Sequence, residues 1–181
     1  EDYQTVFAKV EGAIAAPTAG LHFTPQLITR LAEKGIGTAT VTLHVGPGTF
    51  QPVKTTNVKH HLMHPEWFEV SKETAERIGE VRQRGGKVVA VGTTVARSLE
   101  SALDEAGQLR PCSGETRLYI LPGFQFRVVN ALLTNFHFPE TTLLMLVSAF
   151  AGLKEAREAY EHAVRERYRF YSYGDAMFIQ E

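Results

Sequence analysis

Cysteine is almost absent from this sequence. The 181 residues contain one, Cys112, which excludes an intramolecular disulfide framework and is typical of a protein from a reducing cytosol. With 44% hydrophobic and 22% charged residues, the composition is that of an ordinary globular protein. A chain of this size can bury about 70% of the surface that its unfolded form exposes. We therefore expect residues 1–181 to form one domain without a stabilising metal or disulfide.

Long apolar runs and a strong excess of one charge are also missing. The longest apolar run, residues 143–151, suits a buried helix and is far shorter than the roughly 20 residues that span a bilayer. The chain begins with EDYQ, without an initiator Met or the apolar segment of a signal peptide, which indicates a fragment or a processed product. The formal net charge of −1 argues against binding nucleic acid through a broad basic surface.

Strand-like segments alternate with helical patterns of about 10–15 residues, which favours an α/β fold with a mixed β-sheet flanked by helices. The expected strands cover residues 5–10, 36–45, 67–70, 87–91, 118–121, 126–134 and 176–179. The expected helices cover residues 24–35, 71–85, 95–105, 141–150 and 153–167. In open α/β sheets, ligands bind at the carboxyl ends of strands, and the unusual loops of this sequence lie there.

Two loops in the first third of the chain combine small residues with polar ones, a composition that lets a ligand approach the backbone closely. The candidate ligand-binding residues are Thr18, Gly20 and His22 in the first loop, and His44, Gly46, Gly48 and Thr49 in the second. The same pattern is typical of a tight surface loop, and a histidine such as His44 at the end of a buried strand is often a hydrogen-bonded core residue. Both interpretations stay open at this point.

A histidine cluster follows, with His60, His61, His64 and Glu66 within seven residues. His60 and His64 could share a helix face, but Pro65 ends any helix there, and the order of a zinc-protease motif is absent. No second His/Cys cluster completes a four-ligand zinc site. Proton transfer or substrate hydrogen bonding by His64 and Glu66 is therefore the better interpretation. In extended backbone these two side chains would point to the same side.

One segment indicates an anion site. The expected strand at residues 87–91 runs into Gly92, Thr93 and Thr94, and a helix follows with Arg97 one turn inside it. The N-terminus of a helix offers free N–H groups and the positive end of the helix dipole, which favour a phosphate or carboxylate. The segment lacks the Gly-Lys-Thr of a P-loop and the glycine pattern of a dinucleotide site. A simple capped helix with an exposed arginine would show the same residues.

Two further loops mix polar and aromatic residues. Asn135 and His137 stand at the end of the expected strand 126–134, and Tyr173 and Asp175 close the segment 169–175, in which aromatic residues follow the basic residue Arg169. Such a combination could stack a nucleobase, although aromatic loops often simply close a core. None of these motifs alone identifies a reaction.

Taken together, however, the motifs resemble one family over essentially the whole chain, the S-adenosylmethionine:tRNA ribosyltransferase-isomerases of queuosine biosynthesis. The resemblance rests on residues 16–23, 43–46, 48–50, 61–64 with Glu66, 91–94 with Arg97, 99–101, 134–137, 142–150, 169–170 and 173–177. Members of that family look longer, with a further N-terminal region that includes a β-barrel domain, and this region is absent here.

The resemblance implies that the ribosyl part of S-adenosylmethionine is transferred to a 7-aminomethyl-7-deazaguanine wobble base of tRNA and isomerised. The products are epoxyqueuosine-tRNA, adenine and methionine. S-adenosylmethionine is thus a consumed cosubstrate, and no true cofactor or metal is implied. The implied protein is a cytoplasmic monomer that acts on tRNA without a membrane.

The implied reaction needs a general base for the C5′ proton, a proton donor for adenine and a site for the methionine carboxylate. The candidates for proton transfer are His44, His64, Glu66, His137 and Asp175. The candidates for substrate binding are Thr18, Gly20, His22, Gly46, Gly48, Thr49, Gly92, Thr93, Thr94, Arg97, Asn135 and Tyr173. Two alternatives stay open: a half that binds tRNA or cosubstrate without activity of its own, and a metal-dependent hydrolase built on the histidine cluster.

Overall fold

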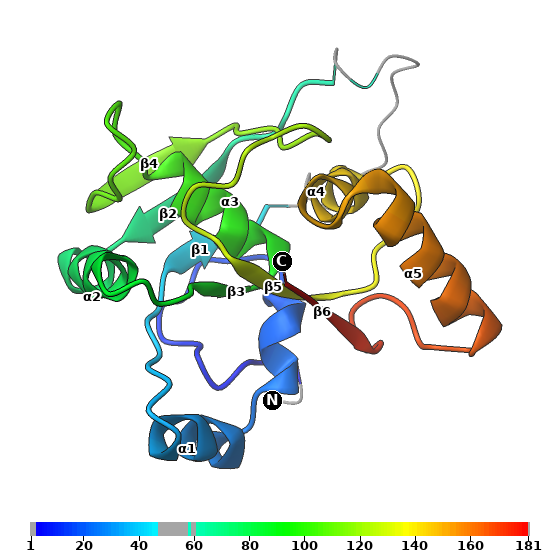
Figure 1. The fold of residues 1–181 in the computed structure, drawn as a ribbon, viewed down its shortest axis with the longest axis horizontal. Helices are drawn as coiled ribbons and strands as arrows, with labels where there is room; N and C mark the ends of the chain where they lie inside the picture. Colours follow the sequence, from blue (N-terminus) through cyan, green and yellow to red (C-terminus); the bar gives the residue numbers. More distant parts are fainter. Residues whose placement is uncertain (1–2, 47–57, 59–60, 181) are drawn as a thin grey trace.

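The computed structural model describes residues 3–46, 58 and 61–180, and Figure 1 shows how helices and strands alternate along them. The helices are η1 (Thr18–His22), α1 (Pro25–Glu33), α2 (Lys72–Gln83), α3 (Thr93–Ser101), α4 (Thr142–Ala151) and α5 (Leu153–Arg165). The strands are β1 (Thr42–His44), β2 (Glu66–Val70), β3 (Val89–Val91), β4 (Cys112–Thr116), β5 (Ala131–Asn135) and β6 (Ala176–Gln180). The predicted α/β class is confirmed.

The strands form two three-stranded sheets instead of the single sheet that the sequence suggests. The first has the order β1-β2-β4 and is antiparallel, and the second has the order β3-β5-β6. In the second sheet β5 runs parallel to β3 and antiparallel to β6, so this sheet is mixed. Val91 pairs with Leu133, which brings the carboxyl ends of β3 and β5 to the same edge. The loops that follow these two strands therefore meet.

One hydrophobic cluster joins the two sheets and their helices. It contains Phe68 of β2, Ile78 of α2, Ala90 of β3, Leu132 of β5 and Leu146 of α4, all nearly inaccessible to solvent. The apolar run that suits a buried helix forms α4, whose Thr141 N-cap accepts a hydrogen bond from the Leu144 N–H. Each Å² of apolar surface that is removed from water contributes about 25 cal/mol. Such a cluster is therefore the main source of the protein's stability.

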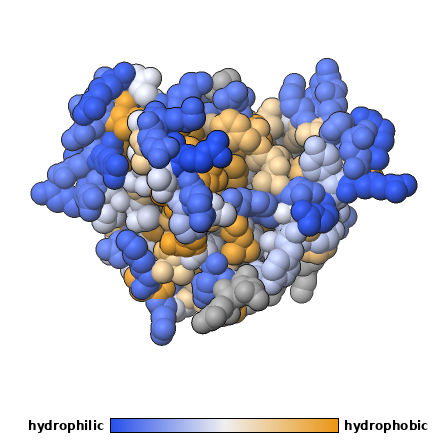
Figure 2. Space-filling view, turned by 90° about the horizontal axis from the view of Figure 1, so that it is seen from below, coloured by the Kyte–Doolittle hydropathy of each residue, from blue (hydrophilic) through white to orange (hydrophobic). Residues whose placement is uncertain are grey.

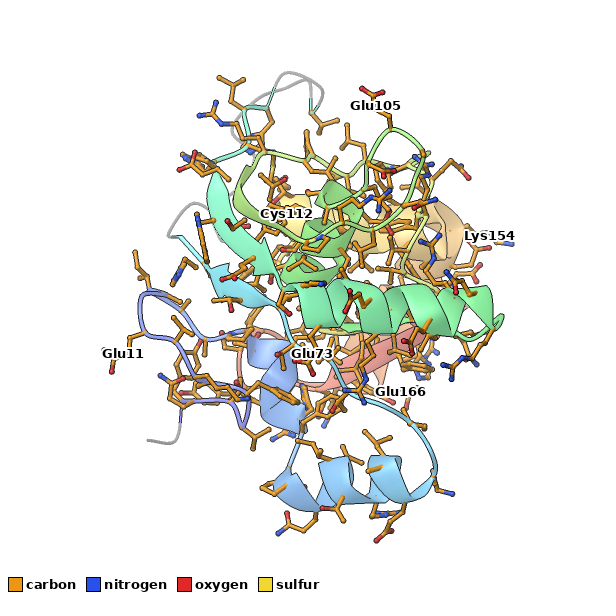
Figure 3. All side chains as sticks on the ribbon, turned by 90° about the vertical axis from the view of Figure 1, so that its left-hand side faces the viewer. Glu11, Glu73, Glu105, Cys112, Lys154 and Glu166 are labelled. Atoms are coloured by element: carbon orange, nitrogen blue, oxygen red, sulfur yellow. The ribbon has the colours of Figure 1, made fainter. Side chains whose placement is uncertain are left out.

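The surface is mostly polar, and α1 stands apart from the rest. Thr24 caps α1 by accepting a hydrogen bond from the Leu27 N–H at 3.1 Å, but the helix has no buried residue, and it lies at the lower edge of Figure 1. Figure 2 shows hydrophobic residues gathered in the middle of one face between hydrophilic flanks. In Figure 3, Glu105 and Lys154 lie at the periphery while Cys112 lies within the fold. Among the described residues no helix is long and apolar enough to cross a membrane.

Two of the predicted strands are wrong. Residues 5–10 form turns, where the Thr5 hydroxyl accepts a hydrogen bond from the Phe7 N–H at 3.3 Å, and residues 118–121 are irregular. Strand β4 was instead formed by the polar segment Cys112–Thr116, which pairs with β2 along its whole length. Because its residues are mainly polar and include a glycine, apolar patterning gives no signal for it.

The predicted strand 126–134 is shortened for a clear physical reason. The buried carboxylate of Glu100 on α3 accepts hydrogen bonds from the backbone N–H groups of Arg127, Val128 and Val129, at 3.0, 2.9 and 3.0 Å. These N–H groups are therefore unavailable to a neighbouring strand, and β5 begins only at Ala131. Likewise, only Thr42–His44 of the predicted strand 36–45 pairs with another strand.

Candidate functional site

An open pocket lies where β3 and β5 end, and it encloses about 400 Å³ including its solvent-open part. Six of the predicted site residues line it, and they come from three loops that are distant in the sequence. These residues are Thr18, Gly92, Thr93, Thr94, Asn135 and His137. Ala16, Pro17, Ala19, Val45, Thr134 and Leu143 complete the lining. The pocket thus lies at the carboxyl ends of parallel strands, as expected for an α/β fold.

The N-terminus of α3 forms one wall of the pocket. Gly92 is the N-cap, with φ 101° and ψ 144°, a conformation that suits glycine. The first N–H groups of any helix have no acceptor within the helix, and at α3 no N-cap side chain accepts from them. The hydroxyl-bearing residues Thr93 and Thr94 line the pocket beside these N–H groups. This wall can therefore bind an anion such as a carboxylate or phosphate.

His137 lies on another wall, with its ring held in place. Its Nε2 is 2.9 Å from the Thr134 hydroxyl, and its backbone N–H donates to the Tyr160 hydroxyl at 2.8 Å. Burial lowers the pKa of the His137 imidazole from 6.5 to about 4, because a buried site disfavours the charged form. The imidazole is therefore neutral near pH 7, and it can donate or accept one hydrogen bond at its other nitrogen.

This shift predicts an acid-sensitive contribution to stability. Between pH 6.5 and about 4 the unfolded chain protonates His137 while the folded chain does not, so the unfolded state binds more protons and stability falls as the pH falls. We expect the free energy of unfolding of the unsubstituted protein to fall by up to about 3 kcal/mol more than that of His137→Gln over this window, at about 1.4 kcal/mol per pKa unit. Denaturant titrations at a series of pH values measure both. Carboxylates titrate in both proteins, so the difference isolates His137. Parallel stability curves would contradict the prediction.

Asn135 contributes a buried acceptor to the same pocket. Its Nδ2 donates to the Tyr171 carbonyl at 3.0 Å, and because a carbonyl only accepts, this bond fixes which side of the amide is oxygen. The Oδ1 atom is fully buried, and it has no hydrogen-bond partner among the described residues. Buried polar atoms are nearly always hydrogen-bonded. A ligand with an N–H or O–H group would satisfy this one.

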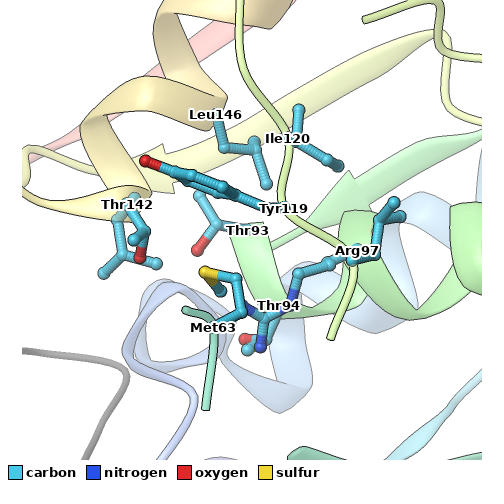
Figure 4. A pocket seen from close by; sticks show the side chains of 10 residues that line it. Met63, Thr93, Thr94, Arg97, Tyr119, Ile120, Thr142 and Leu146 are labelled. Carbon is cyan, nitrogen blue, oxygen red and sulfur yellow. The ribbon is translucent and has the colours of Figure 1, made fainter. Parts of the chain in front are cut away.

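A smaller pocket adjoins the first and shares Thr93, Thr94 and Leu143 with it. Figure 4 shows the Arg97 side chain extending beside Thr94 and Met63, with Tyr119 and Thr142 on the opposite side. Arg97 forms a buried ion pair with Glu66. Burial lowers the pKa of the Arg97 guanidinium to about 10, so it stays charged at neutral pH, where Glu66 balances that charge.

The predicted pairing of His64 with Glu66 across one cleft is wrong. Glu66 is buried at the start of β2 and contacts Arg97, whereas His64 is exposed. The alternation of extended backbone does not apply between them because β2 begins only at Glu66, after Pro65. Any role of either residue in proton transfer stays a prediction.

The remaining candidates that the structure describes line neither pocket. His44 lies in β1 with its ring 4.8 Å from that of Trp67, and Gly20 and His22 lie in η1. Asp175 forms an ion pair with Arg169 at 3.0 Å, and hydrogen bonds from the Arg169 side chain and backbone lower the pKa of the carboxyl group. Gly46 follows the pocket residue Val45, and Tyr173 is exposed. The last two candidates, Gly48 and Thr49, lie outside the described residues.

The structure also bears on the predicted histidine cluster. Within the described part of the chain, no three His, Cys, Asp or Glu side chains come together in a way that could hold a metal ion. His61 instead has its ring 5.6 Å from that of Tyr119, and His60 lies outside the described residues. The metal-dependent hydrolase therefore gains no support from His61, His64 and Glu66.

Three residues that sequence reasoning missed shape the site. Thr134 holds the His137 ring, Tyr119 lines the adjoining pocket, and Glu100 fixes the segment 127–129 before β5. Thr134 and Glu100 fall within segments that carry the family resemblance, but only the fold shows their partners. Tyr119 falls in a segment whose apolar residues predicted a strand, so nothing marked it as a pocket residue.

The fold is that of an α/β protein, with a pocket at the carboxyl ends of two parallel strands. The sequence model of the family described as "Queuosine biosynthesis protein" matches residues 1–179. The chain belongs to this family.

Relatives and a solved structure agree with that assignment. Over 178 residues the chain is 62% identical to the S-adenosylmethionine:tRNA ribosyltransferase-isomerase of Pelobacter propionicus, covering 98% of this chain and 52% of the relative. It is 55% identical to the enzyme of that name from Dichelobacter nodosus, covering 99% and 51%. The crystal structure of an S-adenosylmethionine tRNA ribosyltransferase from Thermotoga maritima is 47% identical with a TM-score of 0.72, covering 89% and 51%. The chain thus spans about half the length of these relatives.

Proposed function

We propose that this chain carries the S-adenosylmethionine site of a tRNA ribosyltransferase-isomerase. The proposed reaction moves the ribosyl group of S-adenosylmethionine to a 7-aminomethyl-7-deazaguanine wobble base of tRNA, isomerises it to epoxyqueuosine and releases adenine and methionine. The observation that carries the proposal is the pocket at the ends of β3 and β5, which gathers Thr18, residues 92–94, Asn135 and His137. Family membership supplies the substrate class.

The start of α3 is the proposed site for the methionine carboxylate. Its free N–H groups and the Thr93 and Thr94 residues face both pockets, and an anion there also benefits from the helix dipole. The Arg97 guanidinium is paired with Glu66. We therefore propose that Arg97 only places positive charge behind this wall, and that the N–H groups and hydroxyls contact the carboxylate directly.

His137 is the proposed hydrogen-bond donor to the departing adenine. A general base works best when its pKa lies near the working pH, so a pKa of about 4 makes His137 a poor base for the C5′ proton. A neutral imidazole can still polarise a reacting group by donating its N–H. The buried Asn135 Oδ1 is the proposed acceptor for an amino group of the same ligand.

The proposal extends to the setting of the reaction. The hydrophobic cluster that joins both sheets in the described part of the chain supports one α/β domain. A tRNA substrate is consistent with a cytoplasmic location, and we propose that the protein acts as a monomer. S-adenosylmethionine is a consumed cosubstrate in this account.

We expect Thr94→Val to weaken S-adenosylmethionine binding about three- to tenfold, because the substitution keeps the shape of the side chain but removes a hydroxyl hydrogen bond worth about 0.5–1.5 kcal/mol. Calorimetric titration without RNA measures this directly, and it also separates a cosubstrate site from a half that binds only tRNA. Thr29→Val, on the exposed face of α1, is the matched control and should bind normally. If S-adenosylmethionine gave no heat of binding with the unsubstituted protein, the proposed site would be overturned.

A further inference from the structure

Two exposed aromatic rings lie parallel beside the pocket. The ring centroids of Phe138 and Tyr171 are 3.5 Å apart, and the planes differ by 16°. Phe138 is 50% exposed and Tyr171 is 41% exposed. Both residues of this stack therefore keep part of their apolar surface accessible to solvent.

This arrangement differs from the other ring contacts of the protein. Among the described residues the other ring pairs are tilted or T-shaped, for example Phe136 with Tyr160 at 75°, which is the geometry that aromatic pairs generally favour over face-to-face stacking. The 3.5 Å separation of Phe138 and Tyr171 is close to the roughly 3.4 Å rise between stacked bases in a nucleic acid strand. A base placed on the outer face of one of the two rings would continue the stack at the same spacing.

The backbone of Tyr171 is held in an unfavourable conformation that positions the ring. Its φ of 70° is common for glycine but rare for a residue with a bulky side chain. Its N–H donates to the Phe136 carbonyl at 3.0 Å, and its own carbonyl accepts from the Asn135 Nδ2 and the Gly174 N–H, each at 3.0 Å. Strained conformations of this kind persist where the surrounding structure fixes them, and they cluster at functional sites.

The stack is directly linked to the pocket. Asn135, which fixes the Tyr171 carbonyl, lines the pocket, and Phe138 follows the pocket residue His137. Arg167, which is exposed, precedes Tyr171 in the same segment and could approach a phosphate backbone, whereas Arg169 is paired with Asp175. Apolar rings, a basic side chain and an adjacent ligand pocket therefore lie within one region.

We propose that Phe138 and Tyr171 form a platform on which an unpaired base of the RNA substrate stacks, next to the base that reacts in the pocket. This inference rests on the proposed function, which supplies the RNA. Aromatic platforms bind single-stranded bases because every base has a π-face, and unpaired loops are where proteins reach RNA bases. The platform therefore holds the loop while the reactive base enters the pocket.

The test uses an RNA hairpin with the fluorescent base aminopurine in its unpaired loop. Phe138→Leu and Tyr171→Leu keep apolar volume but remove the π-face, and each should weaken hairpin binding about tenfold and abolish the quenching of aminopurine. Phe138→Tyr and Tyr171→Phe should bind and quench as the unsubstituted protein does. Phe178→Leu is the control, because Phe178 is 55% exposed on β6 and lies outside the platform. Thermal melting of each variant checks folding.

The outcomes separate the platform from the proposed function. Unchanged hairpin affinity in both leucine variants, with normal S-adenosylmethionine binding, would overturn the platform alone. Failure of the unsubstituted protein to bind the hairpin at low salt would overturn the platform and the tRNA substrate together. A leucine variant that changes the oligomeric state in sedimentation, with RNA binding intact, would assign this surface to a protein contact and also overturn the platform.

Discussion

Replacing Glu66 with alanine is expected to lower the free energy of unfolding by about 3–5 kcal/mol, the usual cost of leaving one charge of a buried ion pair without its partner. The side chains of Glu66 and Arg97 are only 6% and 5% exposed, so water cannot solvate the guanidinium that remains. Urea unfolding followed by circular dichroism measures the loss. Removal of the arginine, in Arg97→Met, should cost a similar amount.

A double variant distinguishes the pair from simple packing loss. Glu66→Gln combined with Arg97→Met removes both charges and should be more stable than either Glu66→Ala or Arg97→Met, because no uncompensated charge stays buried. The exposed pair Lys72–Glu76, with side chains 79% and 63% exposed, provides the control, since Glu76→Ala should change stability by less than about 1 kcal/mol. Stability within about 1 kcal/mol of the unsubstituted protein in both single variants would contradict this account.

His137→Ala is expected to lower kcat for the proposed ribosyl transfer about 100-fold or more, the usual effect of removing a group that assists proton transfer or a developing charge. The neutral ring, fixed by Thr134, is the group that we propose assists the departing base. Single-turnover measurement of adenine release reports this step directly.

Two companion variants define the role of the ring. Thr134→Val should lower kcat about tenfold, because it removes the hydrogen bond that orients the imidazole but leaves the imidazole in place. His162→Ala, on the exposed surface of α5, should leave kcat within about twofold. If His137→Ala retained kcat within about threefold, His137 would be structural, and His44 would become the next candidate.

The sequence was sufficient to predict the α/β class and most helices, because those signals are local. Thr24, Ser71 and Thr141 are of the residue types that favour helix starts, and each accepts a capping hydrogen bond in the structure. The division into two sheets depends on which strands pair, and pairing is set by contacts between distant residues. The polar strand β4 and the shortened β5 could not be predicted, since the first lacks apolar alternation and the second depends on Glu100.

Part of the site was also predictable from local signals in the sequence. The loops at Gly92 and Asn135 follow buried strands, and the parallel pairing of β3 with β5 brings them together. The Glu66–Arg97 ion pair joins residues 31 positions apart in the sequence. A sequence pattern cannot show that the charge of one candidate residue neutralises the charge of another. The low pKa of His137 likewise follows from burial in the folded chain.

The most direct test of the central claim is the fate of the ribose of S-adenosylmethionine. The complete gene product would be given S-adenosylmethionine labelled in its ribose, together with tRNA carrying the 7-aminomethyl-7-deazaguanine base, and the label, adenine and methionine would be counted. The account predicts labelled tRNA in equal amounts with free adenine and free methionine. Methylated RNA with S-adenosylhomocysteine, or unlabelled tRNA at saturating concentrations of both substrates, would contradict it.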